Sequence, residues 1–209
     1  MKKPLITVLI VAAMFLTFGI ELLVPDLDGL VNAYGFSGDN MLVRPHVAFT
    51  SIFLHAGIVH LLSNVLVLLV FGVALEPEIG KKWYLAIFFG GALLGDALSL
   101  LFYPPASVAI GASAGIFALI GAGIFVKPFD FSVNPPMPLA LLGIMYAVYN
   151  VYGFFAGPQD ISYVGHLGGL IAGSAYGVNR ACVKKGLIAI IAVLIILVML
   201  PFAVRLLAV

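Results

Sequence analysis

Five polar side chains that could do chemistry lie within otherwise apolar stretches of this sequence. In chain order they are His55, His60, Asn64, Ser113 and His166. Polar groups inside membrane-length apolar runs are costly and usually face a cavity or the interior of a helix bundle. A serine within hydrogen-bond reach of a histidine is the arrangement that activates a hydroxyl for attack on a carbonyl. Ser113 and His166 are therefore candidates for the nucleophile and general base of an acyl-transfer reaction.

Helical periodicity groups His60 with Asn64 and separates both from His55. At about 100° per residue, His60 and Asn64 lie roughly 40° apart on a helix, whereas His55 lies roughly 140° from His60. Measured from Phe49, His60 and Asn64 would lie about 16 to 22 Å along one helix. A helical zinc site would place two histidines four residues apart with a third ligand nearby. The spacing disfavours a metal site, and we interpret His55 as a structural residue that bonds backbone or a loop.

The elements that carry these residues are predicted to be membrane-spanning helices. The chain has 209 residues, of which 63% are hydrophobic and 9% charged, and its mean hydropathy is +1.21. The predicted spans are Leu5 to Val24, Phe49 to Leu75, Trp83 to Phe102, Ser113 to Val126, Met137 to Phe155, Val164 to Val178 and Leu187 to Leu207. Their continuous apolar character and their approach to about 20 residues favour helices over the alternating strands of a barrel. We predict an all-α polytopic membrane protein.

The chain is predicted to form a single membrane domain over residues 1–209, with a core at about 44–180 and an accessory C-terminal helix at about 186–207. Its longest connection, Pro25 to Ala48, is rich in Pro, Gly, Asn and Asp, and is either ordered for a purpose or mobile. The net charge of +1 and the lack of a basic stripe argue against a nucleic-acid partner. Cys182 is the only cysteine, so no internal disulfide is possible.

Lysine and arginine are distributed unevenly between the two sides of this seven-helix arrangement. One side holds Lys2, Lys3, Lys81, Lys82, Lys127, Arg180, Lys184 and Lys185. The other holds Arg44 and Arg205, which predicts a cytoplasmic amino terminus in the plasma membrane. The first apolar run continues to Val24 without a small-x-small cleavage site, so we predict a retained span. Ser113 and His166 then begin inward-running helices near the external face, and their site opens to the outside.

A ridge of glycines in the sixth span could bring these two residues together. The glycines recur every four residues, at Gly165, Gly169, Gly173 and Gly177. Small residues at this spacing let helix backbones pack closely in membranes. Close packing of the fourth and sixth spans would place Ser113 within hydrogen-bond reach of His166.

Five motifs follow one another between about Arg44 and Gly177: Thr50-Ser51-x-Phe53-x-His55-Ala56, His60-Leu-Leu-x-Asn64, Gly72-x-x-x-Glu76-x-x-x-Gly80, Gly111-Ala112-Ser113 and His166-x-x-Gly169-x-x-x-Gly173. In this order, the motifs resemble the rhomboid family of intramembrane serine proteases. The resemblance implies a rhomboid-like six-helix bundle, here with a seventh C-terminal helix. It also implies a dyad of Ser113 and His166 without a third carboxylate, and we interpret Asp96 as structural and Asp160 as a loop residue.

The same resemblance implies how other residues support the dyad. Supporting glycines are Gly111, Gly169 and Gly173. Phe117, four residues after the serine, would stack on the histidine ring. The oxyanion would be held by the Ser113 backbone N–H, by His60 and by the Asn64 amide. Ala114 stands where the family usually has glycine, and its methyl group is expected to crowd the oxyanion site slightly.

We therefore predict a serine endopeptidase that cleaves transmembrane segments of membrane proteins through an acyl-enzyme, with no metal and no cofactor. Its partners would be transmembrane protein substrates and the lipid bilayer. One alternative is a non-catalytic rhomboid-like protein that binds membrane segments, although such proteins lack the serine or the histidine. Another is a small transporter, whose spans would also carry polar groups, although no inverted repeat is visible. A third is metal-dependent proteolysis, which inhibition by a chelator would indicate.

Overall fold

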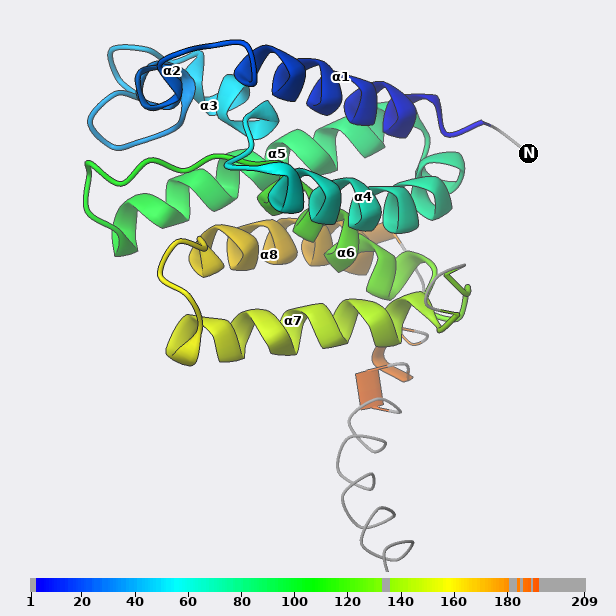
Figure 1. The fold of residues 1–209 in the computed structure, drawn as a ribbon. Coiled ribbons are helices and arrows are strands. Elements are labelled where there is room, and N and C mark those ends of the chain that lie inside the picture. The colour runs from blue at the N-terminus through cyan, green and yellow to red at the C-terminus, as the bar shows by residue number, and fades with distance from the viewer. Residues whose placement is uncertain (1–2, 133–135, 181–183, 185, 189, 192–209) are drawn as a thin grey trace, which may run out of the picture.

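The chain folds into a bundle of six principal helices (Figure 1). The computed structural model describes residues 3–132, 136–180, 184, 186–188 and 190–191. The principal helices are α1 (Leu5–Glu21), α4 (Ile58–Ile79), α5 (Lys81–Phe102), α6 (Ser113–Val126), α7 (Leu139–Ala156) and α8 (Tyr163–Arg180). The predicted all-α bundle is confirmed. The expected seventh helix, at about 186–207, falls largely outside the described residues.

Helix α6 lies at the centre of the bundle. It packs against α4, α5, α7 and α8, with α1 and α4 above it and α7 below it in the view of Figure 1. Every residue from Gly115 to Phe125 is buried, so this helix has no solvent-facing or lipid-facing side. A helix that is apolar all round is stable only when it is enclosed on all sides. The central position of α6 therefore follows from its composition.

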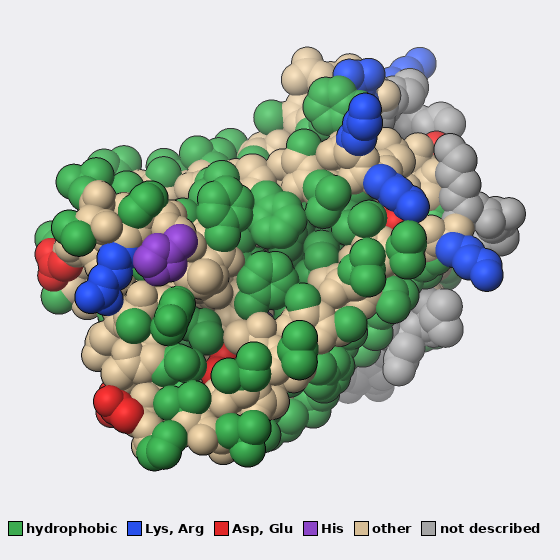
Figure 2. Space-filling view, turned by 90° about the horizontal axis from the view of Figure 1, so that it is seen from above, with side chains coloured by type: hydrophobic (Ala, Val, Ile, Leu, Met, Phe, Trp, Pro, Cys, Tyr) green, Lys and Arg blue, Asp and Glu red, His purple; other side chains and the backbone are tan. Residues whose placement is uncertain are grey.

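The outer surface of the bundle suits a bilayer. Helices α4, α5 and α7 are long and apolar enough to cross a membrane, whereas α1 and α6 are apolar but shorter. Large hydrophobic side chains such as Leu16, Leu66 and Tyr152 are exposed on the outer helices. Figure 2 shows a face dominated by hydrophobic side chains, with most of its Lys and Arg side chains gathered toward one end. The chain is thus a multi-pass membrane protein.

The second predicted span is not one continuous helix. Two short elements, α3 (Val47–Thr50) and the 3₁₀ turn η1 (Ser51–Phe53), precede an extended link, and α4 begins only at Ile58. Leu54 and Gly57 have extended backbone angles, which end the first turn of helix before the second begins. Helix α4 then continues through Pro77 to Ile79, four residues beyond the predicted end.

This break overturns the helical-wheel argument about the histidines. Because His55 lies in the extended link, its angle to His60 on a single helix has no meaning. The two imidazole rings lie edge to face with their centroids 5.1 Å apart. His60 is also the third residue of α4, so it lies about 3 Å from the start of that helix and not 16 Å along a span.

A buried carboxylate ties α1 to α4. Glu76 is 2% exposed, and its oxygens accept hydrogen bonds from the backbone N–H groups of Ile6 and Thr7 at 2.8 Å and from the Thr7 hydroxyl at 2.9 Å. The first N–H groups of a helix have no partners within it, and negative charge at that end is favourable. Glu76 therefore satisfies the start of α1 from a neighbouring helix. The Gly72-x-x-x-Glu76-x-x-x-Gly80 pattern is explained in part by this contact.

The long connection between α1 and α4 is ordered. Helix α2 (Leu27–Tyr34) begins with an N-cap, in which the Asp26 carboxylate accepts from the Gly29 N–H at 2.9 Å. Phe36 exchanges two backbone hydrogen bonds with Ala109, at 3.0 and 2.7 Å. Gly111 N–H donates to the Ser51 carbonyl at 2.8 Å. This connection therefore fixes the segment that leads into Ser113.

Candidate active site

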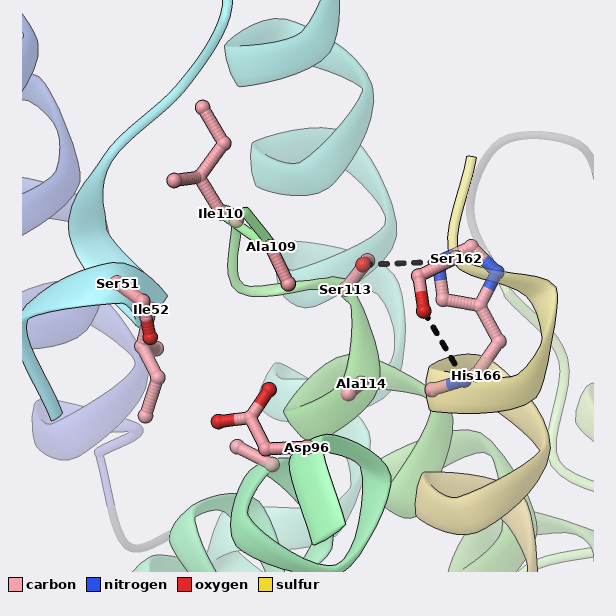
Figure 3. Close-up of a pocket in the computed structure, with 12 residues that line it drawn as sticks. Ser51, Ile52, Asp96, Ala109, Ile110, Ser113, Ala114, Ser162 and His166 are labelled. Atoms are coloured by element: carbon pink, nitrogen blue, oxygen red, sulfur yellow. Dashed lines mark hydrogen bonds between the residues drawn. The ribbon is translucent and has the colours of Figure 1, made fainter. Parts of the chain in front are cut away.

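Ser113 and His166 meet at one end of the bundle. Ser113 is the first residue of α6, and His166 lies in the first turn of α8. A hydrogen bond of 2.8 Å joins Ser113 Oγ to His166 Nε2 (Figure 3). Both side chains are half-buried, and they point toward each other across the two helix starts. This is the distance and pairing that nucleophilic activation of a serine requires.

The glycines of α8 set the distance between the two helices. A Cβ atom on Gly169 would lie 1.9 Å from the Ala114 carbonyl oxygen, and one on Gly173 would lie 1.7 Å from the Ala118 carbonyl oxygen. Cβ atoms essentially never approach other atoms within 3.0 Å, so α8 packs backbone against backbone on α6 only because these positions are glycine. The predicted glycine ridge is present, and it lies beside the serine and the histidine.

Aromatic rings hold the plane of the imidazole. Phe117 lies one turn after Ser113 and stacks on His166, with ring centroids 4.4 Å apart and an angle of 7° between the planes. Tyr163 meets the same imidazole edge-on, with centroids 6.3 Å apart. Tyr146 of α7 packs edge-on against Phe117 at 6.3 Å. The stacking expected for Phe117 is found in this geometry.

The second nitrogen of His166 has a partner that we did not predict. Asn150 of α7 places its Oδ1 2.9 Å from His166 Nδ1, and its Nδ2 donates to the Tyr163 carbonyl at 2.9 Å. Asn150 is only 3% exposed. The rule that polar residues inside membrane spans are functional candidates could have identified it, because it is an amide within the apolar fifth span.

His60 and Asn64 lie together, and a glycine brings His60 toward the serine segment. A Cβ atom on Gly111 would lie 2.8 Å from His60 Nε2, so the imidazole lies directly against that glycine, two residues before Ser113. Gly111 has φ +115°, which L side chains rarely adopt. The Asn64 amide donates to the His60 carbonyl at 2.9 Å. Among the hydrogen bonds of the described residues, none joins Asn64 to Ser113.

A small cavity of about 30 Å³ lies beside Ser113 and His166, with room for one or two water molecules. Asp96 of α5 lines it, and Figure 3 places the carboxylate of Asp96 in this cavity. Asp96 Oδ2 is buried without a hydrogen-bond partner in the described part of the chain. Ala114 also lines the cavity, and its methyl group would lie 2.8 Å from a Cβ on Gly95, so it faces α5. Asp96 thus borders the site, and the Ala114 methyl is directed toward α5.

The residues near His60 do not form a metal centre within the part of the chain that the structure describes. No group of three or more His, Cys, Asp or Glu residues there is arranged to hold a metal ion. His55 Nδ1 bonds the Phe53 carbonyl at 3.0 Å, and its backbone N–H bonds Glu21. His55 therefore makes the backbone and loop contacts expected of a structural histidine.

The fold and the site together define a class of protein. It is a helical membrane bundle with a hydrogen-bonded serine and histidine at one end. The rhomboid domain matches residues 42–182 of the chain. The chain therefore belongs to the rhomboid family.

Individual relatives differ in what their names state about activity. The chain is 35% identical over 139 residues to Rhomboid protease GluP of Bacillus subtilis (strain 168), covering 63% of the chain and 26% of GluP. It is 29% identical over 127 residues to Rhomboid-like protease 2 of Toxoplasma gondii, covering 61% and 44%. It is 34% identical over 133 residues to Inactive rhomboid-related protein 2 of Caenorhabditis elegans, covering 60% and 37%. The chain thus spans less than half the length of each of these relatives.

Proposed function

We propose that this protein is an intramembrane serine endopeptidase that cleaves transmembrane segments of membrane proteins. One observation carries the proposal, which is the 2.8 Å hydrogen bond between Ser113 Oγ and His166 Nε2. An interhelical hydrogen bond between two half-buried polar side chains needs a reason in a membrane bundle, because two apolar side chains would pack there at lower cost. General-base activation of a hydroxyl supplies that reason.

The proposed reaction is acyl transfer through the serine. Ser113 Oγ attacks the scissile carbonyl carbon while His166 Nε2 takes the hydroxyl proton. The tetrahedral intermediate collapses when the imidazolium gives that proton to the leaving amine, and an acyl-enzyme remains. Water then attacks the ester, with His166 again as base, and releases the second product and the free serine. The cavity beside Ser113 has the size to hold such a water.

Three donors are proposed to stabilise the oxyanion. The Ser113 backbone N–H lies at the start of α6, where helix N–H groups lack helical partners. His60 Nδ1 accepts from the Ala56 N–H at 3.4 Å, so a neutral His60 carries its proton on Nε2, on the side of Gly111. Asn64 uses one amide N–H for the His60 carbonyl and keeps the other for a ligand. Loss of one such donor typically lowers the rate by about 10²- to 10³-fold.

The proposed substrates are helices that unwind near the cut. Peptide bonds inside an intact helix are shielded, so weak helix formers such as Gly or Pro near the scissile bond would favour cleavage. The outward face of α7 carries exposed aromatic side chains, including Tyr149, Tyr152 and Phe155. We propose that this face borders the route between α4 and α7 by which a substrate helix reaches Ser113. A belt of interfacial aromatic residues is the other interpretation of these side chains.

The orientation in the membrane is also proposed from charge. Lys81 and Lys82, together with Lys127, lie at the end of the bundle opposite Ser113 and His166. Under the positive-inside rule this end faces the cytoplasm, and the candidate active site opens to the external side of the plasma membrane. We further propose that residues 1–209 act as one membrane domain, with the rhomboid core at about 44–180.

Cleavage of a model single-span substrate by the purified protein in liposomes tests the proposal. We expect wild type to give a defined product and Ser113→Ala and His166→Ala to give none. A serine-directed phosphonate should label wild type and spare both variants. Equal product from wild type and Ser113→Ala would refute serine catalysis. Binding of the substrate without cleavage by wild type would instead indicate a non-catalytic function, of the kind that the name of the inactive relative suggests.

A further inference from the structure

We propose that Asn150 is a positioning residue that fixes both the tautomer and the ring orientation of His166. The inference rests on the proposed function, and it extends the expected two-residue arrangement to Ser113, His166 and Asn150. Asn150 comes from α7, whereas the other two residues come from α6 and α8. Three helices would then build the catalytic unit.

The amide of Asn150 can have only one orientation. One of the two polar ends of the amide lies 2.9 Å from the Tyr163 carbonyl oxygen, which accepts hydrogen bonds and cannot donate them. The NH₂ group must therefore face Tyr163, because a flipped amide would set two carbonyl oxygens against each other. Oδ1 is then the atom that lies 2.9 Å from His166 Nδ1. This oxygen can only accept, so His166 Nδ1 must donate.

The direction of this hydrogen bond determines what Nε2 can do. A neutral imidazole carries one proton, and placing it on Nδ1 leaves a lone pair on Nε2. Nε2 lies 2.8 Å from Ser113 Oγ, so it accepts the serine hydroxyl as a general base must. When the serine proton moves to Nε2, the hydrogen bond from Nδ1–H to Asn150 is retained. The positively charged imidazolium then donates this hydrogen bond to the amide oxygen, which stabilises it. Asn150 itself neither gains nor loses a proton.

The burial of Asn150 and its contacts around His166 indicate that the amide has a role at this position. Asn150 is 3% exposed within a helix that otherwise presents apolar and aromatic side chains, where an apolar residue would be cheaper. Its contacts complete a cage around one imidazole, with Phe117 stacked on the ring and Tyr163 at its edge. The ring face is held by Phe117, but stacking alone does not choose between the two tautomers. Among the hydrogen bonds of the described residues, the one to the Asn150 oxygen makes that choice.

Kinetics of Asn150 variants in liposomes provide the first test. Asn150→Ala should lower kcat by about 10- to 100-fold with little change in KM, because both tautomers become accessible while the substrate contacts remain. Asn150→Asp keeps an oxygen that accepts from Nδ1, but its second oxygen would face the Tyr163 carbonyl oxygen, so it should recover only part of this loss. Ser99→Ala is the matched control, because it removes a part-buried hydrogen bond of 3.0 Å between Ser99 of α5 and Ser162, the residue before α8, without touching the imidazole. The control should keep wild-type kcat.

The tautomer itself provides a second test that does not depend on activity. In ¹⁵N-histidine-labelled protein, long-range ¹H–¹⁵N spectra should show His166 protonated at Nδ1, with the signal assigned by its loss in His166→Gln. Asn150→Ala should give a mixture of tautomers. Wild type with the proton on Nε2, or an unchanged tautomer and unchanged kcat in Asn150→Ala, would overturn the inference and leave serine catalysis intact. Failure of wild type to cleave, with Nδ1 protonated as expected, would count against the proposed function alone.

Discussion

Replacement of Gly169 by alanine tests whether the packing of α8 on α6 sets the catalytic geometry. The added Cβ would lie 1.9 Å from the Ala114 carbonyl oxygen, which is a backbone atom that cannot rotate away. Real Cβ contacts essentially never fall below 3.0 Å, so the helices must separate locally by at least 1.1 Å, the difference between 3.0 and 1.9 Å. Gly169 is three residues from His166, and Ala114 is adjacent to Ser113. The shift therefore acts within one turn of both residues.

This separation is large compared with the tolerance of the serine–histidine bond. A shift of 1.1 Å along the line joining Ser113 Oγ and His166 Nε2 would lengthen their 2.8 Å contact to about 3.9 Å, beyond hydrogen-bond reach. Misplacement of a catalytic group by about 1 Å can cost about 10²-fold in rate. Overpacking should also lower the free energy of unfolding by about 1–3 kcal/mol. We expect activity to fall much further than stability.

The assay compares cleavage rate, phosphonate labelling rate and thermal unfolding in detergent for Gly169→Ala and a matched control. Gly90→Ala in α5 is the control, because a Cβ there meets no atom within 4 Å. Its rates should equal those of wild type, and its stability should be equal or slightly higher. If Gly169→Ala cleaved and labelled at the control rate while remaining folded, backbone packing would not be what holds the two residues together.

Three further predictions concern the Glu76 contact between α1 and α4, remote from Ser113, and two residues near the candidate active site, Gly111 and Asn64. Glu76→Ala should lower the free energy of unfolding by about 3 kcal/mol because three donors of α1 lose a charged partner. Glu78 is exposed, so Glu78→Ala should leave the free energy of unfolding unchanged, and thermal unfolding in detergent measures both variants. Gly111→Ala should reduce cleavage strongly, since φ +115° costs about 1–3 kcal/mol for alanine and its Cβ would meet His60; wild-type rates would contradict this. Asn64→Ala should lower kcat by about 10²-fold with KM nearly unchanged, whereas a purely structural Asn64 would give lower stability with normal kcat in the folded fraction.

The sequence was most informative where periodicity and side-chain size act locally. The glycine ridge around Gly169 follows from four-residue spacing alone, because only glycine permits backbone contact between helices. The resemblance to the rhomboid family implied the stacking of Phe117 on His166, and the structure places Phe117 one turn after Ser113 on the same face of α6. Apolar runs likewise located the principal helices, although their ends shifted by several residues.

Sequence reasoning was least informative where contacts come from distant segments. The apolar run from Phe49 onward gave no sign that the chain leaves the helix at Leu54, because the extended link is held by partners elsewhere, such as Glu21 on the His55 N–H. Asn150 was missed for a similar reason. Its partner is 16 residues away across a loop, and no motif links an amide in the fifth span to a histidine in the sixth.

The Glu76 contact shows that the folded unit extends beyond the part of the chain that matches the rhomboid domain. The recognised domain begins at residue 42, whereas the donors bound by Glu76 belong to α1, at Ile6 and Thr7. A version of the protein cut at the recognised boundary would leave a carboxylate with none of these three donors inside a membrane helix, which is a costly arrangement. Any minimal form of this protein must therefore retain α1, although family recognition does not depend on that helix.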